Sequence, residues 1–158
     1  MTGTAIRLAR DDEAEAVRRL VLDAYGHYVA RIGKPPGPML DDYAQRIAQR
    51  QVSVIEEDGR LLGILVLEEE SDAILLDNIA ILPAAQGRGL GRALIAHAEA
   101  ETRRRGHGLL RLYTHVLMTE NIRLYGRLGF RETGRGEEKG FERVYMAKAV
   151  AGPGGGDS

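Results

Sequence analysis

The sequence predicts a mixed α/β fold in which helices alternate with a largely antiparallel sheet. Segment 52–67 carries two β-prone runs on either side of an Asp-Gly pair, the residue types that form a tight hairpin turn. Further along, a helical pattern at 89–105 connects two apolar strand candidates at 74–82 and 109–115. A helical crossover of this kind makes the two strands parallel, so the predicted sheet is mixed.

The other elements follow from the spacing of apolar residues and from turn residues. Asp11 or Asp12 is expected to cap the first helix, because a carboxylate at that place accepts backbone N–H groups. The proline- and glycine-rich stretch 33–38 separates that helix from the next. The remaining expected elements are a strand at 5–9, helices at 11–28, 41–49 and 120–128, and a closing strand pair at 130–133 and 143–147.

Length and composition fit one globular domain. With 158 residues, 44% of them hydrophobic, the chain can bury one core, which we expect to span residues 1–150. The last eight residues, 151–158, have little to bury and are expected to form a disordered glycine-rich tail. The N-terminus lacks the apolar core of a signal peptide and no run is long enough to span a bilayer, so we expect a cytoplasmic protein with no membrane partner.

Charge and cysteine content exclude several functions. A net charge of −1 with dispersed arginines argues against nucleic-acid binding. The absence of cysteine removes disulfides, thiolate catalysis and cysteine-ligated zinc, and no metal is expected. The chemistry must therefore use oxygen and nitrogen groups.

The glycine-rich stretch 86–91 is the most informative motif. It follows an apolar strand and leads directly into a helix, so its backbone can bend with several N–H groups pointing inward at the positive end of the helix dipole. A dinucleotide-binding turn needs Gly-x-Gly-x-x-Gly and a later acidic residue, and a Walker loop needs Gly-Lys-Ser/Thr; neither pattern is present. The alternative is a tight connection without a ligand. We interpret the stretch as a pyrophosphate cradle.

This loop, together with the downstream run 121–130, resembles the GNAT superfamily of acyl-CoA-dependent N-acetyltransferases over residues 74–130. In that family the loop has the pattern Arg/Gln-x-x-Gly-x-Gly/Ala, whose fixed positions correspond to Gln86, Gly89 and Gly91. The resemblance implies a single domain with a mixed, mostly antiparallel sheet, helices on both faces, and a parallel strand pair splayed around acetyl-CoA.

The resemblance also implies site residues. Tyr125 corresponds to a tyrosine near the coenzyme sulfur, which can give a proton to the departing thiolate. The family commonly has an asparagine seven residues before this tyrosine, where this chain has Met118, and a variant has it four before, at Asn121. Arg88 and Arg92 border the cradle and can meet phosphates. The expected coenzyme-binding residues are Ile79, Ala80, Ile81, Gln86, Gly87, Arg88, Gly89, Leu90, Gly91, Arg92 and Asn121.

No motif assigns the general base. Asp77 is the first candidate, because it interrupts an apolar strand where a carboxylate needs a reason or a partner; the alternative is an outward-facing strand residue. Glu120 and His115 follow. The acceptor pocket is expected from the irregular helix–loop–helix region near the N-terminus, and the expected substrate-binding residues are Tyr25, Tyr28 and His115.

The resulting hypothesis is an N-acetyltransferase that moves an acetyl group from acetyl-CoA to a primary amine. The amine attacks directly, without a covalent enzyme intermediate, and belongs to a small-molecule or amino-acid-like acceptor. Two alternatives stay open: a non-catalytic acyl-CoA-binding regulatory module, and a protein or peptide N-acetyltransferase. Exposed strand edges and apolar helix faces favour a homodimer.

Overall fold

The computed structural model describes residues 3–150, so the tail predicted at 151–158 lies outside the described residues. The chain divides into two compact units. The first comprises Met1–Leu67 and Asn78–His97, and the second comprises Glu68–Asp77 and Ala98–Ser158. Two strands and one helix contribute residues to both units.

The described chain is a series of short strands and helices. In chain order they are β1 (Ala5–Leu8), the 3-10 helix η1 (Asp11–Glu13), α1 (Ala14–Tyr25), α2 (Tyr28–Ile32), η2 (Gly37–Leu40), α3 (Tyr43–Ala48), β2 (Val52–Glu57), β3 (Arg60–Glu69), β4 (Ile74–Ile81), η3 (Pro83–Ala85), α4 (Leu90–Arg104), β5 (Leu109–His115), α5 (Thr119–Arg127), β6 (Arg131–Glu138) and β7 (Phe141–Ala149). The strands form a mixed seven-stranded sheet in the order β1-β2-β3-β4-β5-β7-β6. The mixed α/β prediction is confirmed.

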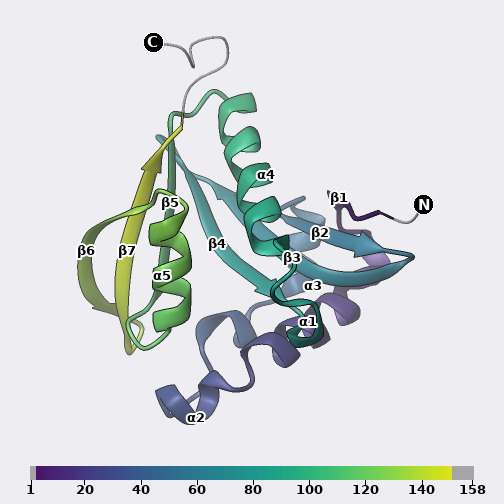
Figure 1. The fold of residues 1–158 in the computed structure, drawn as a ribbon, viewed down its shortest axis with the longest axis horizontal. Helices are drawn as coiled ribbons and strands as arrows, with labels where there is room; N and C mark the ends of the chain where they lie inside the picture. The colour runs from purple at the N-terminus through teal and green to yellow at the C-terminus, as the bar shows by residue number, and fades with distance from the viewer. Residues whose placement is uncertain (1–2, 151–158) are drawn as a thin grey trace. The chain divides into compact units, whose positions relative to one another are not determined.

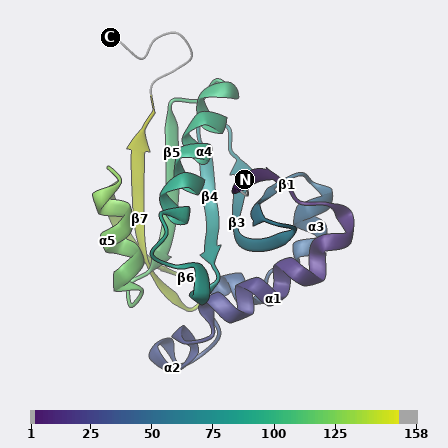
Figure 2. The same cartoon turned by 45° about the vertical axis from the view of Figure 1, so that its right-hand side comes forward.

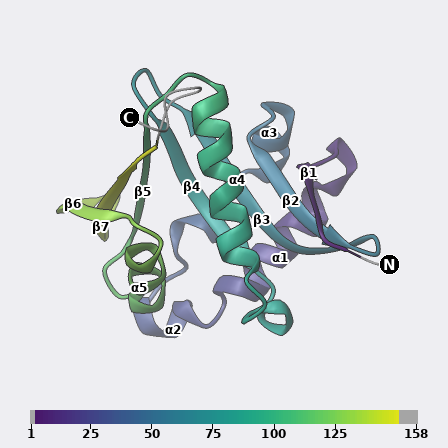
Figure 3. The same ribbon diagram turned by 45° about the horizontal axis from the view of Figure 1, so that its top comes forward.

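In the first unit, β1, β2 and β3 lie side by side as antiparallel neighbours (Figure 3). The hairpin between β2 and β3 turns at Asp58 and Gly59, whose φ angles of 55° and 79° are those of the predicted tight turn. Helices α1 and α3 pack against each other (Figure 2). The core combines apolar side chains from helix and strand, among them the fully buried Val17, Val21 and Ile64.

The start of the first helix differs from the prediction. Neither Asp11 nor Asp12 caps it; instead the Glu13 carboxylate accepts the Arg10 backbone N–H at 2.7 Å. Glu13 lies one turn further on and can reach back because the helical segment begins with the 3-10 helix η1. The helix also ends at Tyr25 rather than near Tyr28, since Gly26 is a poor helix former.

Glu13 is expected to make stability sensitive to acid. Hydrogen bonds from the Arg7 guanidinium lower the pKa of Glu13 from its ordinary 4.5 to about 2, although partial burial opposes this. The stabilisation is therefore present above pH 4.5 and is lost as the pH falls toward 2. We expect Glu13→Gln to lower the free energy of unfolding by about 1–2 kcal/mol at pH 7 and by almost nothing at pH 2.

Urea unfolding at the two pH values measures this difference. Glu15→Gln is the matched control, because Glu15 pairs with Arg18 and Arg19 on the exposed side of α1 and should change stability little. An equal loss for Glu13→Gln at both pH values would contradict the assignment.

In the second unit, β5, β7 and β6 form an antiparallel group beside α5 (Figure 1). Alternate residues of β5 are buried, and paired residues of β7 share that face, so Leu110, Leu112, Val144 and Met146 form its core. The opposite face of the same two strands carries polar and aromatic side chains.

The closing hairpin is longer than predicted. β6 continues to Glu138 and β7 begins at Phe141. The two strands reach this far because Lys139 and Gly140 take φ angles of 52° and 80° and make a tight turn between them. The sequence prediction missed this turn, since lysine is not one of the residues that mark a two-residue hairpin loop.

β4 and β5 form the predicted parallel pair, and their pairing is short. Backbone partners run from Ile74 and Leu110 to Leu76 and Leu112, although both strands continue beyond these residues.

No helix within residues 3–150 is long and apolar enough to cross a membrane.

Candidate functional site

The glycine-rich loop has the conformation of an anion cradle. Gly87 and Gly89 have φ angles of 82° and 80°, which favour glycine, and a Cβ added at either position would meet nothing within 4 Å. Backbone conformation, not space, therefore requires glycine. Ala93 donates to the Gly89 carbonyl at 3.1 Å, the first bond of α4. The N–H groups of residues 89–92 thus have no acceptor inside the helix and can bind an anion.

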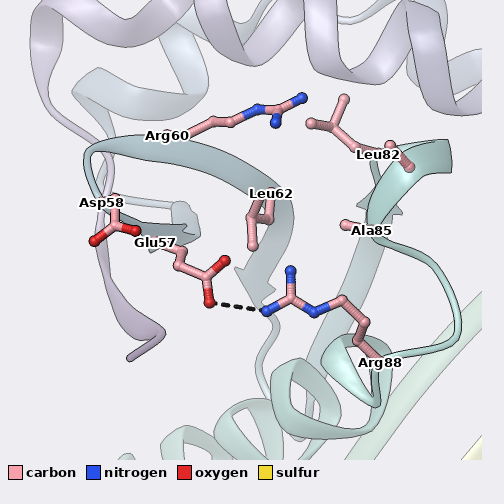
Figure 4. Close-up of a pocket in the computed structure, with 8 residues that line it drawn as sticks. Glu57, Asp58, Arg60, Leu62, Leu82, Ala85 and Arg88 are labelled. Carbon is pink, nitrogen blue, oxygen red and sulfur yellow. Dashed lines mark hydrogen bonds and ion pairs between the residues drawn. The ribbon is translucent and has the colours of Figure 1, made fainter. Parts of the chain in front are cut away.

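Arg88 does not point into this cradle. Its guanidinium pairs with Glu57 at 2.8 Å, which ties the loop to the β2–β3 hairpin and raises the pKa of Arg88 (Figure 4). A pocket of about 300 Å³ lies beside the pair. It is lined by Glu57, Asp58, Arg60, Leu62, Leu82, Ala84, Ala85 and Arg88.

A buried polar network holds the C-terminal half of β4 to the helices of the first unit. The Tyr25 hydroxyl lies 2.7 Å from Asn78 Oδ1 and 2.8 Å from the Ile79 carbonyl oxygen, and Asn78 Nδ2 donates to Tyr43 Oη at 3.0 Å. Tyr43 in turn donates to the Pro38 carbonyl. Tyr25, Asn78 and Tyr43 are all buried, so these bonds fix the strand relative to α1 and α3.

The direction of the β4 backbone follows from two contacts. Leu82 donates its N–H to Leu62 of β3 at 2.9 Å, and backbone groups alternate sides along a strand. The N–H and C=O groups of Ile81 and Ile79 therefore point away from β3. Gly63 lets the strands approach closely, because a Cβ there would lie 2.7 Å from Ile81 Cδ1.

Tyr125 lies in the second unit, where its ring is buried and packs edge-on against Phe130 with ring centroids 5.8 Å apart. Asn121, one turn earlier on α5, donates to Met118 Sδ at 3.7 Å. The asparagine therefore contacts the residue that replaces the more common asparagine of the family. Gln86 belongs to the first unit, and its Nε2 lies 3.5 Å from the Ile81 carbonyl oxygen.

Asp77 is half-buried and paired. Tyr113 Oη donates to Asp77 Oδ1 at 3.0 Å, so the carboxylate has the partner that its place in an apolar strand requires. His115 Nδ1 accepts the Leu117 N–H at 3.0 Å. If the His115 ring is neutral, its proton is therefore on Nε2, and the other nitrogen, Nδ1, is already occupied by the hydrogen bond from Leu117. This contact favours Asp77 over His115 as base.

Tyr28 is buried beside the irregular N-terminal region. Its ring packs against His27 with centroids 3.9 Å apart, and the Arg31 guanidinium lies 5.0 Å from its centroid. Tyr25 and Tyr28 also contact each other, at 6.0 Å between centroids. The structure thus brings these two predicted acceptor residues together in the first unit, whereas His115 lies in the second.

Two further polar residues join these contacts without having been predicted as site residues: Asn78 and Tyr113. Asn78 offered a signal, since a second polar residue after Asp77 interrupts the same apolar run. Tyr113 offered none, because a tyrosine in a strand is ordinary. Within residues 3–150 no three His, Asp or Glu side chains lie close enough to hold a metal ion.

Fold and loop together define a class of mixed α/β proteins. In this class a glycine-rich loop joins one strand of a parallel pair to the N-terminus of the helix that crosses to the other strand. Residues 48–132, more than half of the chain, match the acetyltransferase (GNAT) domain, and the chain belongs to this family.

Individual relatives are similar over shorter stretches. [Ribosomal protein bS18]-alanine N-acetyltransferase of Escherichia coli strain K12 is 35% identical over 78 residues, covering 49% of this chain and 53% of that protein. Streptothricin acetyltransferase of Streptomyces lavendulae is 30% identical over 83 residues, covering 51% and 44%. The chain thus spans about half the length of the curated relatives it matches.

Solved structures share the fold. PaiA N-acetyltransferase from Thermoplasma acidophilum, solved with coenzyme A, superposes with a TM-score of 0.79 and 18% identity over 94% of this chain and 99% of that one. The ribosomal-protein-S18-alanine N-acetyltransferase from Escherichia coli superposes with a TM-score of 0.76 and 23% identity over 99% of each chain. This likeness supports the fold alone.

Proposed function

We propose that the protein is an acetyl-CoA-dependent N-acetyltransferase that acetylates a primary amine. The observation that carries the proposal is the loop at 86–91, whose positive-φ glycines and helix N-terminus suit a pyrophosphate. Family membership and the coenzyme A bound to a structural neighbour support it.

The proposed coenzyme-binding residues come from strand, loop and helix. Bound acetyl-CoA supplies an acetyl group on a thioester. The backbone groups of Ile79 and Ile81 face away from β3 and can offer hydrogen bonds to an extended arm, although the Ile79 carbonyl also accepts from Tyr25. Asn121 completes the set on α5.

The proposed chemistry assigns one task to each side chain. An amine is protonated near pH 7 and must lose a proton before it attacks, and Asp77 takes that proton. The Ile81 N–H stabilises the oxyanion that develops on the thioester carbonyl. Tyr125 gives its proton to the departing thiolate.

The proposed acceptor is a small-molecule or amino-acid-like amine bound near Tyr25 and Tyr28, and His115 of β5 stays a predicted substrate-binding residue. A peptide N-terminus is the second candidate, because one relative is named for acetylating an alanine of a ribosomal protein, whereas another is named for streptothricin. Mass spectrometry of a mixture of amino acids, amines and alanine-starting peptides after incubation with acetyl-CoA separates the two. Cytoplasmic location and a homodimer stay predictions.

Calorimetric titration with acetyl-CoA tests the cradle. We expect Gly89→Ala to weaken binding about tenfold, because alanine at positive φ costs about 1–2 kcal/mol and the loop must change shape. Gly134→Ala is the matched control: that site on β6 has equally open space and no positive φ. Unchanged affinity of Gly89→Ala would contradict the cradle.

The Arg88–Glu57 pair gives a second, smaller effect. Glu57 neutralises a cation next to the cradle, so Glu57→Gln should free Arg88 for phosphate and tighten acetyl-CoA binding about threefold at low salt. The control is Glu56→Gln, because Glu56 pairs with Arg7 instead. Weaker binding by Glu57→Gln in the same titration would show that the pair supports the loop rather than competing for Arg88.

A further inference from the structure

The polar face of β5 and β7 contains a contact that the proposed chemistry has not used. Backbone pairing between the parallel strands ends at Leu76 and Leu112, and the next residues, Asp77 and Tyr113, are joined by their side chains at 3.0 Å. The hydrogen bond from the Tyr113 hydroxyl to Asp77 therefore joins the two strands directly after their last backbone pair. It fixes one carboxylate oxygen at the point where the strands cease to pair.

The Tyr113 ring is itself held in place. The Arg143 guanidinium lies over it, 3.9 Å from the ring centroid, and Tyr145 packs beside it with centroids 6.5 Å apart. Arg143 is only 13% exposed and pairs with Glu138 at 3.0 Å. A ring clamped from two sides presents its hydroxyl in one direction, so the bond to Asp77 is preorganised.

From these contacts, and resting on the proposed function, we propose that Tyr113 is the positioning residue for the Asp77 carboxylate. Its O–H holds the carboxylate in one orientation for the transfer of the amine proton. In the step itself the amine N–H bond breaks and an O–H bond forms on Asp77. Tyr113 keeps its own proton throughout.

Other charged groups share this face of the second unit. Arg111, two residues before Tyr113, pairs with Glu70 and Asp72. His115 follows two residues after Tyr113. Tyr113→Phe removes none of these charges, so the charged surroundings of Asp77 stay the same apart from the lost hydroxyl.

The test compares Tyr113→Phe with Tyr145→Phe. Both remove a hydroxyl from the same face and keep the ring, but the Tyr145 hydroxyl donates to Glu138 at 2.8 Å. The first readout is the titration of the Asp77 carboxyl carbon by NMR, which does not depend on turnover. Loss of a donor to a carboxylate disfavours its charged form, so we expect Tyr113→Phe to move the titration of Asp77 to higher pH and Tyr145→Phe to leave it unchanged.

The second readout is the pH dependence of acetyl transfer. We expect Tyr113→Phe to lower kcat about tenfold, to move the acid limb of kcat/KM to higher pH by the same amount, and to leave the KM for acetyl-CoA unchanged. Combined with Asp77→Asn it should add no further loss, because both act through one carboxylate. An unmoved Asp77 titration overturns the positioning role even if the enzyme is active. If Tyr113→Phe moves the titration of Asp77 but the wild type shows no acetyl transfer, the proposed function is contradicted, whereas the hydrogen bond between Tyr113 and Asp77 is established.

Discussion

Replacing Tyr125 with phenylalanine lowers kcat for acetyl transfer about a hundredfold, with little change in the KM for acetyl-CoA. The reason is the loss of the proton donor for the departing thiolate, a step for which general acid catalysis contributes 10²–10⁴-fold. The ring stays, and with it the edge-on contact with Phe130, so packing in the buried interior of the second unit is preserved. Steady-state kinetics with saturating acceptor measures the effect.

The control for Tyr125→Phe is Tyr145→Phe, which loses a hydroxyl from a less buried position on β7. Its kcat should stay within about twofold of the wild type, because the Tyr145 hydroxyl bonds to Glu138 and has no part in the proposed proton transfer to the thiolate. A loss of kcat that is equal in the two variants, or a loss that appears only in KM, would assign Tyr125 to packing or to coenzyme binding rather than to proton transfer.

Replacing Asn78 with leucine, which has a similar size, lowers the free energy of unfolding by about 2 kcal/mol. Two buried hydrogen bonds are lost, one accepted from Tyr25 and one donated to Tyr43, and each contributes about 1 kcal/mol. The melting temperature should fall by about 4–8 °C for a chain of this size. Thermal unfolding followed by circular dichroism measures it.

Thr102→Val provides the comparison for Asn78→Leu. Thr102 is also buried and polar, but its hydroxyl bonds only within its own helix, to the Ala98 carbonyl at 2.7 Å, so the loss should be smaller. Adding Tyr43→Phe to Asn78→Leu should cost less than the sum of the single changes, because the two share one bond. Strict additivity would mean that the network does not act as a unit.

The fold was largely predictable because its signals are local. The Asp58-Gly59 turn, the crossover helix and the end of that helix at Gly106 each depend on a few neighbouring residues, and the structure confirms them. The cap of the first helix was wrong because Asp11, Asp12 and Glu13 are equally plausible in sequence. The 3-10 helix η1 that precedes α1 decides which of these carboxylates reaches back.

The site was predictable where it depends on backbone conformation and not where it depends on side-chain partners. Positive φ at Gly87 and Gly89 follows from the spacing of the glycines. The partners of Asp77 and Arg88 could not be foreseen, because Tyr113 and Glu57 lie 36 and 31 residues away in sequence and meet them only through sheet pairing and the hairpin. Long-range pairs of this kind leave no periodic signal.

The most direct test of the central claim is thiol release from acetyl-CoA by the wild-type protein, measured with and without a panel of amines, amino acids and short peptides. An N-acetyltransferase predicts release that depends on an acceptor, saturates with it, and is accompanied by an equal amount of acetylated product. Acetyl-CoA binding in calorimetry with no acceptor-dependent release on any member of the panel would contradict catalysis and favour a non-catalytic acyl-CoA-binding module.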